Sequence, residues 1–139
     1  MNRILRLLVV FLLVVGLTVL QVPSADAQAA TKLAFTTQPS SSNTAAVPFA
    51  TQPVVTVQDA NNATVANFSG TVTLAITSGT GTSGAVLSGA TTVTVSNGVA
   101  AFSGLSIDKA GPGYTLTATS GGLTPATSIT PFNVAVGAA

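Results

Sequence analysis

Hydrophobic and polar residues alternate with a period of two along most of the chain that follows residue 27. The clearest run covers 71–77, where Val72, Leu74 and Ile76 alternate with threonine and alanine. Weaker versions of the same pattern occur at 33–35, 55–57, 93–95, 100–102, 114–118 and 132–136. Such alternation is typical of strands with one buried face, and no window shows the 3.6-residue period of an amphipathic helix. The pattern therefore predicts an all-β domain.

Turn-forming residues separate the alternating runs. Asn97-Gly98 stands directly between two of them, and a type I′ turn needs positive φ at both central positions, which this pair tolerates. The glycine-rich segment 78–84 (SGTGTSG) predicts a mobile hairpin end. Many short strands joined by such turns predict an antiparallel sandwich of seven or eight strands, and a closed barrel is the alternative.

The first 27 residues have a different pattern. Two arginines accompany an almost wholly apolar stretch over 4–20, a proline follows, and Ala-Asp-Ala ends at Ala27. This order predicts a helical secretory signal peptide over 1–27 and one mature domain over 28–139. An uncleaved membrane anchor is the alternative, because the stretch approaches the length that spans a bilayer. We expect a secreted or surface-associated protein that touches the membrane only through the signal before cleavage.

Charge is almost absent from the mature part, whose only charged side chains are Lys32, Asp59, Asp108 and Lys109. A neutral surface has no counterion-release drive toward nucleic acid, and near-zero net charge favours self-association. The whole chain has no histidine and no cysteine. The remaining residues offer no activated nucleophile, no acid–base pair and no cofactor motif, so we predict a protein without catalytic activity or cofactor.

Several stretches of the mature part resemble the bacterial immunoglobulin-like domains of secreted and cell-surface proteins. They are 33–40 (LAFTTQPS), 54–62 (VVTVQDANN), 97–124, and 129–136 (ITPFNVAV). Within the third, GPGYTLTA resembles a tyrosine corner, in which the hydroxyl of a residue such as Tyr114 bonds to upstream backbone. The resemblance implies a Greek-key immunoglobulin-like sandwich with a structural or adhesive role at the cell surface or in the extracellular matrix.

Calcium is the one metal that the side chains suggest. Asp59, Asn61, Asn62 and Asp108 carry oxygen atoms of the kind that calcium prefers, although the ion takes six to eight of them. The competing interpretation is that the aspartate and asparagines after residue 58 only shape a turn.

A binding role would use the loops, since loops commonly carry function in sandwich domains. The candidate contact residues are Asn62, Asn67, Phe68, Thr80 and Thr82. Their partner would be a protein or a glycan at the cell surface. A second alternative is a filament subunit, in which the segment 28–42 is donated to the sheet edge of a neighbouring copy. A Lys32–Asn133 isopeptide is disfavoured, because alternation points the lysine toward solvent.

Overall fold

The computed structural model describes residues 28–138, and the predicted signal peptide over 1–27 lies outside the described residues. Regular structure in this part consists of strands alone, so the described residues contain no helix that could cross a membrane. The strands are β1 (Lys32–Thr37), β2 (Ser42–Thr44), β3 (Val54–Gln58), β4 (Thr71–Ile76), β5 (Leu87–Ser88), β6 (Thr92–Thr94), β7 (Val99–Ala101), β8 (Ser106–Ile107), β9 (Gly111–Tyr114), β10 (Leu116–Thr119), β11 (Ala126–Thr127) and β12 (Phe132–Ala135). The prediction of an all-β domain is confirmed.

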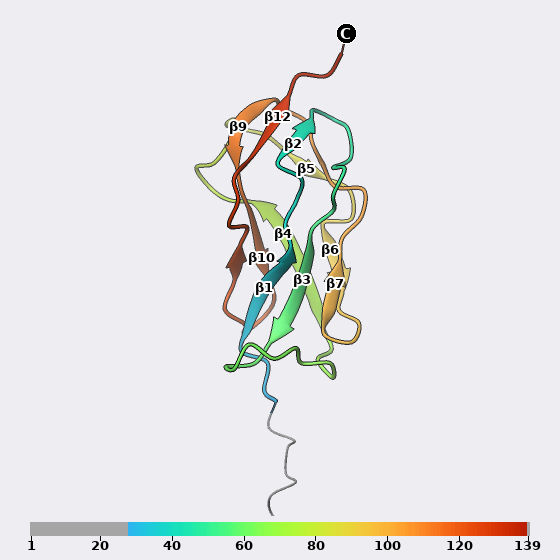
Figure 1. Ribbon diagram of the computed structural model, residues 1–139, viewed down its shortest axis with the longest axis vertical. Coiled ribbons are helices and arrows are strands. Elements are labelled where there is room, and N and C mark those ends of the chain that lie inside the picture. The colour runs from blue at the N-terminus through green and yellow to red at the C-terminus, as the bar shows by residue number, and fades with distance from the viewer. Residues whose placement is uncertain (1–27, 139) are drawn as a thin grey trace, which may run out of the picture.

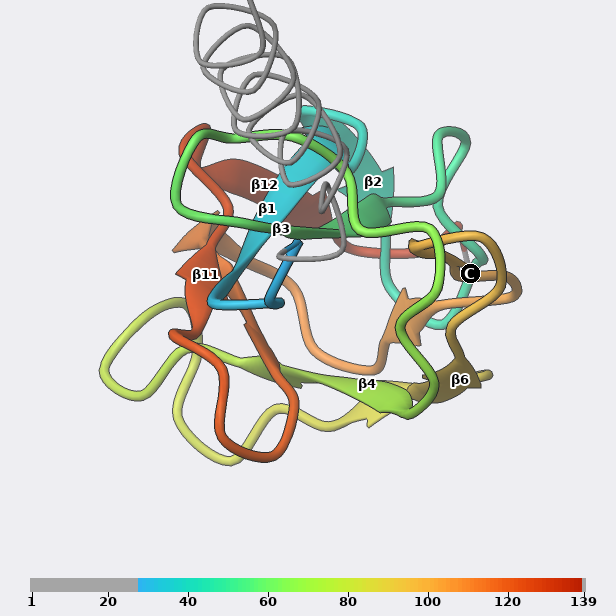
Figure 2. The ribbon, with the colours of Figure 1, turned by 90° about the horizontal axis from the view of Figure 1, so that it is seen from below.

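The strands form four small sheets, with the orders β1-β3-β7, β11-β10-β4-β6, β2-β12-β9 and β5-β8. Every pairing is antiparallel except that of β2 with β12, which is parallel. Viewed along the long axis, β1, β3 and β12 lie on one side of the domain and β4 and β6 on the other (Figure 2). The sheets therefore face each other in two layers, as in a sandwich, around an elongated core (Figure 1).

The described residues form twelve short strands, so the expected number of seven or eight was too low. Four of the additional strands, β2, β5, β8 and β11, are only two or three residues long and lie where the sequence shows no alternating run. A further one arises because a continuous alternating run changes partners midway. This is the run 111–119: β9 pairs with β12, whereas β10, after a break at Thr115, pairs with β4 and β11. The segment that follows β1 forms β2, which pairs with β12 rather than with β3. Alternation shows that one face of a strand is buried, but it does not show which strand is the pairing partner.

The two layers are joined by hydrogen bonds on one side of the domain and by a turn of the chain on the other. On one side Leu33 donates its backbone N–H to Thr124 O at 3.0 Å, and Thr124 N–H donates to Thr31 O at 2.9 Å. On the other side the Asn97-Gly98 turn carries the chain from β6 in one layer to β7 in the other. Asn97 and Gly98 have φ of 51° and 77°, which confirms the predicted turn with positive φ at both positions. The bonds to Thr124 cover the start of the outer side of β1, which is an edge strand of its sheet.

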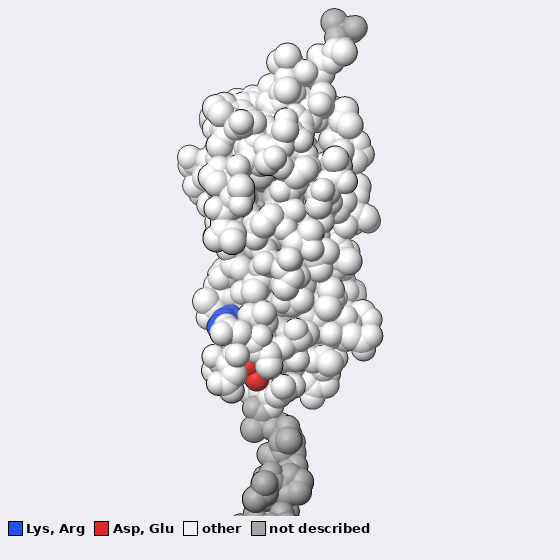
Figure 3. Space-filling model, in the orientation of Figure 1, with Lys and Arg blue, Asp and Glu red and all other residues white. Residues whose placement is uncertain are grey.

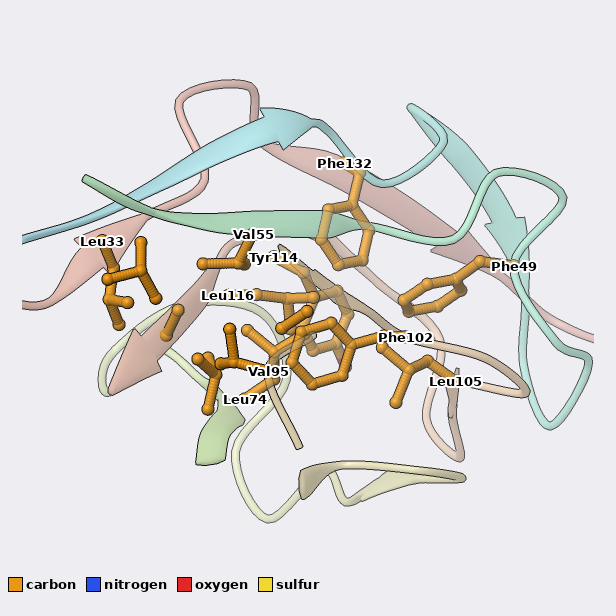
Figure 4. Packing of buried hydrophobic residues seen from close by; sticks show 14 of the residues in the cluster. Leu33, Phe49, Val55, Leu74, Val95, Phe102, Leu105, Tyr114, Leu116 and Phe132 are labelled. Atoms are coloured by element: carbon orange, nitrogen blue, oxygen red, sulfur yellow. The ribbon is translucent and has the colours of Figure 1, made fainter. Parts of the chain in front are cut away.

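Aromatic residues fill the centre of the core (Figure 4). Tyr114 and Phe132 stack with their ring centroids 5.9 Å apart, and Phe49 meets the Phe132 ring edge-on at 5.4 Å. Val72 and Leu74 point inward from β4, as the alternation predicts. Thr71, Thr73 and Ala75 on the same strand are exposed. All seventeen buried hydrophobic residues lie between Leu33 and Val134, so the segment 28–138 contains its own core.

Candidate functional site

The Asp59 carboxylate organises the turn that follows β3. This side chain is only 8% exposed, and its Oδ1 accepts the backbone N–H groups of Asn61 at 2.8 Å and Ala63 at 2.9 Å. Asn62 has a left-handed backbone, φ 66°, and its Oδ1 accepts a hydrogen bond from Lys32 Nζ. Two of the four proposed calcium ligands therefore already have partners within the protein, in an arrangement typical of an Asx turn.

Asp108 does not join the other three candidates. The chain reaches Asp59 at the end of β3, whereas β7 runs antiparallel to β3 and leads from Val99 away from that end toward β8 and Asp108. There, Asp108 Oδ1 accepts the backbone N–H of Val86 at 2.7 Å. No group of three acidic, histidine or cysteine residues occurs within 28–138. The fold thus divides the proposed calcium ligands between its two ends.

The loop between β3 and β4 exposes the most amide side chains. Asn61, Asn62 and Asn67 are all exposed there. Phe68 is half-buried, packs against the core cluster, and lies so close to Gly70 that a Cβ on the glycine would be 2.9 Å from the ring. Asn67 is therefore available to a partner, while Phe68 has mainly a packing role.

The glycine-rich loop 78–84 differs from the expected mobile hairpin end. Thr80 Oγ1 donates to Thr77 O at 2.8 Å and accepts the backbone N–H of Thr115 at 3.2 Å. Thr82 Oγ1 donates to Ala110 O at 2.6 Å. The two hydroxyls that we proposed as contact groups are thus used to attach the loop to the segment around β9. The sequence of the loop itself does not indicate that Thr80 and Thr82 bond to residues far along the chain.

Gly81 brings the same loop against the core. Its φ is 66°, and a Cβ at this position would lie 2.1 Å from Cε1 of Tyr114. The tyrosine ring is fully buried and its hydroxyl donates to Lys109 O at 2.8 Å. This bond to a carbonyl five residues upstream has the direction expected of a tyrosine corner, although Tyr114 ends β9 rather than beginning the next strand. The loop, the ring and the corner form one packed unit.

Lys32 and Asn133 have separate partners. Lys32 contacts Asn62, and Asn133 Oδ1 accepts the backbone N–H of Gly113 at 3.1 Å. Their strands also belong to different sheets, since β1 pairs with β3 whereas β12 pairs with β2 and β9. The segment considered as a donated strand is likewise engaged within its own chain: β1 pairs with β3 on one side and bridges to Thr124 on the other.

Threonines cover the outer face of the four-stranded sheet. The outward residues are Thr71, Thr73, Thr92, Thr94, Thr117, Thr119 and Thr127, interrupted by Ala75. Cross-strand pairs bring their hydroxyls together: Thr73 and Thr92 are 3.0 Å apart, and Thr117 and Thr77 are 2.8 Å apart. The sequence shows the alternation on each strand, but only the strand order reveals a continuous hydroxyl surface without charge.

The opposite face is also nearly uncharged. In Figure 3 a basic and an acidic group lie close together near one end, and the rest of that face has no ionisable side chain. On the other layer, the loop that follows β4 forms a hollow of about 380 Å³. It is lined by residues 76–85, all of them Ile, Thr, Ser, Gly or Ala. A surface of this kind offers shape and hydroxyl groups but no acid, base or charged anchor.

Comparison with known proteins does not assign the chain to a family. No model of a known protein family matches the chain, and no curated protein sequence matches it. Arguments about function therefore rest on the geometry described above.

Proposed function

We propose that this protein is an exported, non-catalytic structural module, an immunoglobulin-like Greek-key sandwich that spaces other parts of a surface or matrix assembly. The observation that carries the proposal is the position of the chain ends. The segment that leads into β1 and the segment that follows β12 leave the elongated domain at opposite ends of its long axis (Figure 1). A module with this geometry adds its full length to whatever it connects.

The covered outer side of β1 supports a module that does not donate this strand to another copy. Exposed edge strands are templates for pairing with another chain, and proteins avoid this by covering or sealing them. Here Thr124 bonds to the outer side of β1, and the Asn97-Gly98 turn connects β6 to β7. The surface is kept in solution by hydroxyl groups rather than by charge, which suits an uncharged spacer.

Light scattering coupled to size exclusion tests this proposal on the exported form. We expect a monomer across a wide concentration series, with the amino-terminal sequence of the purified protein beginning near Gln28. Growth of the molar mass with concentration, or fibres, would contradict a self-sufficient spacer and favour the filament subunit. A protein retained in the cell with residues 1–27 intact would contradict export.

An adhesive role is the second candidate, and the loop between β3 and β4 is the specific observation that favours it. Asn61 and Asn67 are exposed beside a rigid turn, which lets amide groups reach a glycan or protein partner at low entropic cost. A screen of glycans and surface proteins with the domain would detect binding. Asn67→Ala should abolish a signal that arises here. Thr127→Ala, exposed on β11 and separated from β4 by β10, should leave it unchanged.

A further inference from the structure

The turn between β6 and β7 holds the only Asn-Gly pair of the chain. Asn97 is exposed, and its side-chain amide forms no hydrogen bond within residues 28–138. The backbone bonds across the turn use the N–H groups of Ser96 and Val99, both at 2.9 Å. Gly98 contributes its carbonyl, which accepts the N–H of Val57 at 2.8 Å, while the Gly98 N–H has no partner in the described part of the chain. An amide carbon and a backbone nitrogen that no other group engages are thus neighbours in the sequence.

The fold itself requires a glycine after Asn97. Gly98 has φ of 77°, and a Cβ there would lie 2.6 Å from Val65 O and 2.7 Å from Cγ2 of Thr64. The preceding position has φ of 51°, a conformation that asparagine adopts more readily than most residues. Because a glycine nitrogen is the least hindered backbone nucleophile, the geometry that selects this pair also makes it chemically reactive.

We propose that Asn97 is a site of spontaneous covalent modification, at which asparagine converts through a succinimide to aspartate and isoaspartate. The backbone nitrogen of Gly98 forms a bond to Cγ of Asn97, the bond from Cγ to Nδ2 breaks, and the proton of the Gly98 N–H leaves with Nδ2 as ammonia. Water then adds to one of the two ring carbonyls and opens the ring. Opening at Cγ gives aspartate, whereas opening at the backbone carbonyl gives isoaspartate. The chemistry needs only water and does not depend on the spacer function.

The two products fit the turn differently. Aspartate keeps the original backbone, and Asp-Gly suits a type I′ turn as well as Asn-Gly does. Isoaspartate routes the backbone through the side chain and lengthens it by one carbon. A two-residue turn of that length cannot keep both bonds between Ser96 and Val99, and the bond from Val57 N–H to Gly98 O is displaced with them. Isoaspartate therefore loosens the point at which the chain passes from one layer to the other.

Asn62 provides a matched control within the same domain. It is exposed and has a left-handed backbone with φ of 66°, like Asn97, but Ala63 follows it and Lys32 donates to its side chain. A Cβ on the following residue hinders the attacking nitrogen, so Asn62 should convert several-fold more slowly. Ring closure at Asn97 also needs rotation about its Cα–C bond, so the turn must open locally. Exposed loops are among the parts of a protein that open at the lowest free energy.

Incubation of the purified exported form at mildly alkaline pH, followed by anion exchange and fragmentation mass spectrometry, tests the proposal. The mature part carries two lysines and two aspartates, so each conversion changes its formal charge from zero to minus one. We expect an acidic species modified at Asn97, and no such species from Asn97→Gly, because Gly-Gly also forms this turn. The isoaspartate form should unfold at a lower urea concentration than the unmodified domain, whereas Asn97→Asp should share the midpoint of the unmodified domain.

Two results would overturn the site. One is conversion of Asn62 as fast as that of Asn97. The other is a folded domain that stays unmodified while the same chain, unfolded in urea, converts at Asn97, since the turn would then protect the pair. An isoaspartate form with an unchanged urea midpoint would contradict the loosened turn. The molar mass of the fresh domain is independent of all three results and tests the spacer proposal separately.

Discussion

Replacement of Gly81 by alanine tests whether the glycine-rich loop is part of the packed core. A Cβ at Gly81 would lie 2.1 Å from Cε1 and 2.2 Å from Cδ1 of Tyr114, much closer than van der Waals contact allows. The ring cannot move aside, because it stacks on Phe132 and its hydroxyl is bonded to Lys109. The loop must therefore leave the ring or the core must rearrange.

Gly79 provides a matched control within the same loop. It also has a left-handed backbone, φ 81°, but a Cβ there would meet nothing within 4 Å. Alanine in this backbone region costs about 1–2 kcal/mol at either position. Gly81→Ala adds an overpacking cost of about 1–3 kcal/mol, so the difference between the two variants isolates the contact with the tyrosine.

Urea unfolding followed by tyrosine fluorescence measures both variants. Tyr114 is the only tyrosine and the chain has no tryptophan, so the signal reports directly on the ring that the loop covers. Linear extrapolation gives the unfolding free energy of each variant. We expect Gly81→Ala to be less stable than Gly79→Ala by about 1–3 kcal/mol. Equal losses in the two variants would show that the loop does not pack on Tyr114 and would refute this reasoning.

Three further contacts are tested by urea unfolding. Here unfolding is followed by circular dichroism, because Tyr114→Phe removes the only tyrosine. Tyr114→Phe removes the hydroxyl that donates to Lys109 O and should lower the free energy of unfolding by about 1 kcal/mol. An unchanged urea midpoint would show that this hydrogen bond does not stabilise the fold. Asp59→Ala should cost about 1–2 kcal/mol and Asp59→Asn less, since the amide oxygen can still accept the turn N–H groups; equal costs would contradict the Asx-turn assignment. A double-mutant cycle of Thr73→Ala and Thr92→Ala should give a coupling of about 0.2–1 kcal/mol, and strict additivity would mean that the hydroxyl pair contributes nothing.

Local features of the fold could be predicted from the sequence. The alternation at 71–77 correctly places Val72 and Leu74 inside and threonines outside. The pair Asn97-Gly98 correctly indicates a turn with positive φ, because few other residues tolerate that conformation twice in succession. Both signals depend on interactions within a few residues, and their physical cause is present in the sequence itself.

Features that depend on distant partners were missed. The sequence 78–84 looks flexible because glycine and serine have no local preference, yet Gly81 packs on a ring more than thirty residues later in the chain. The change of partner at Thr115 leaves the alternation intact, so the strand count was too low. Asp108 appeared equivalent to Asp59 as a ligand, because composition does not reveal that β7 runs antiparallel to β3 and carries the chain away from Asp59 before it reaches Asp108.

Small-angle X-ray scattering of two and three tandem copies of residues 28–138 tests the spacer proposal most directly. The copies would be joined from Ala138 of one to Gln28 of the next. Because the segments before β1 and after β12 leave the domain at opposite ends of the long axis (Figure 1), we expect the maximum dimension to grow by about one domain length with each added copy. A maximum dimension that hardly grows from two copies to three, as in copies packed side by side, would contradict the account.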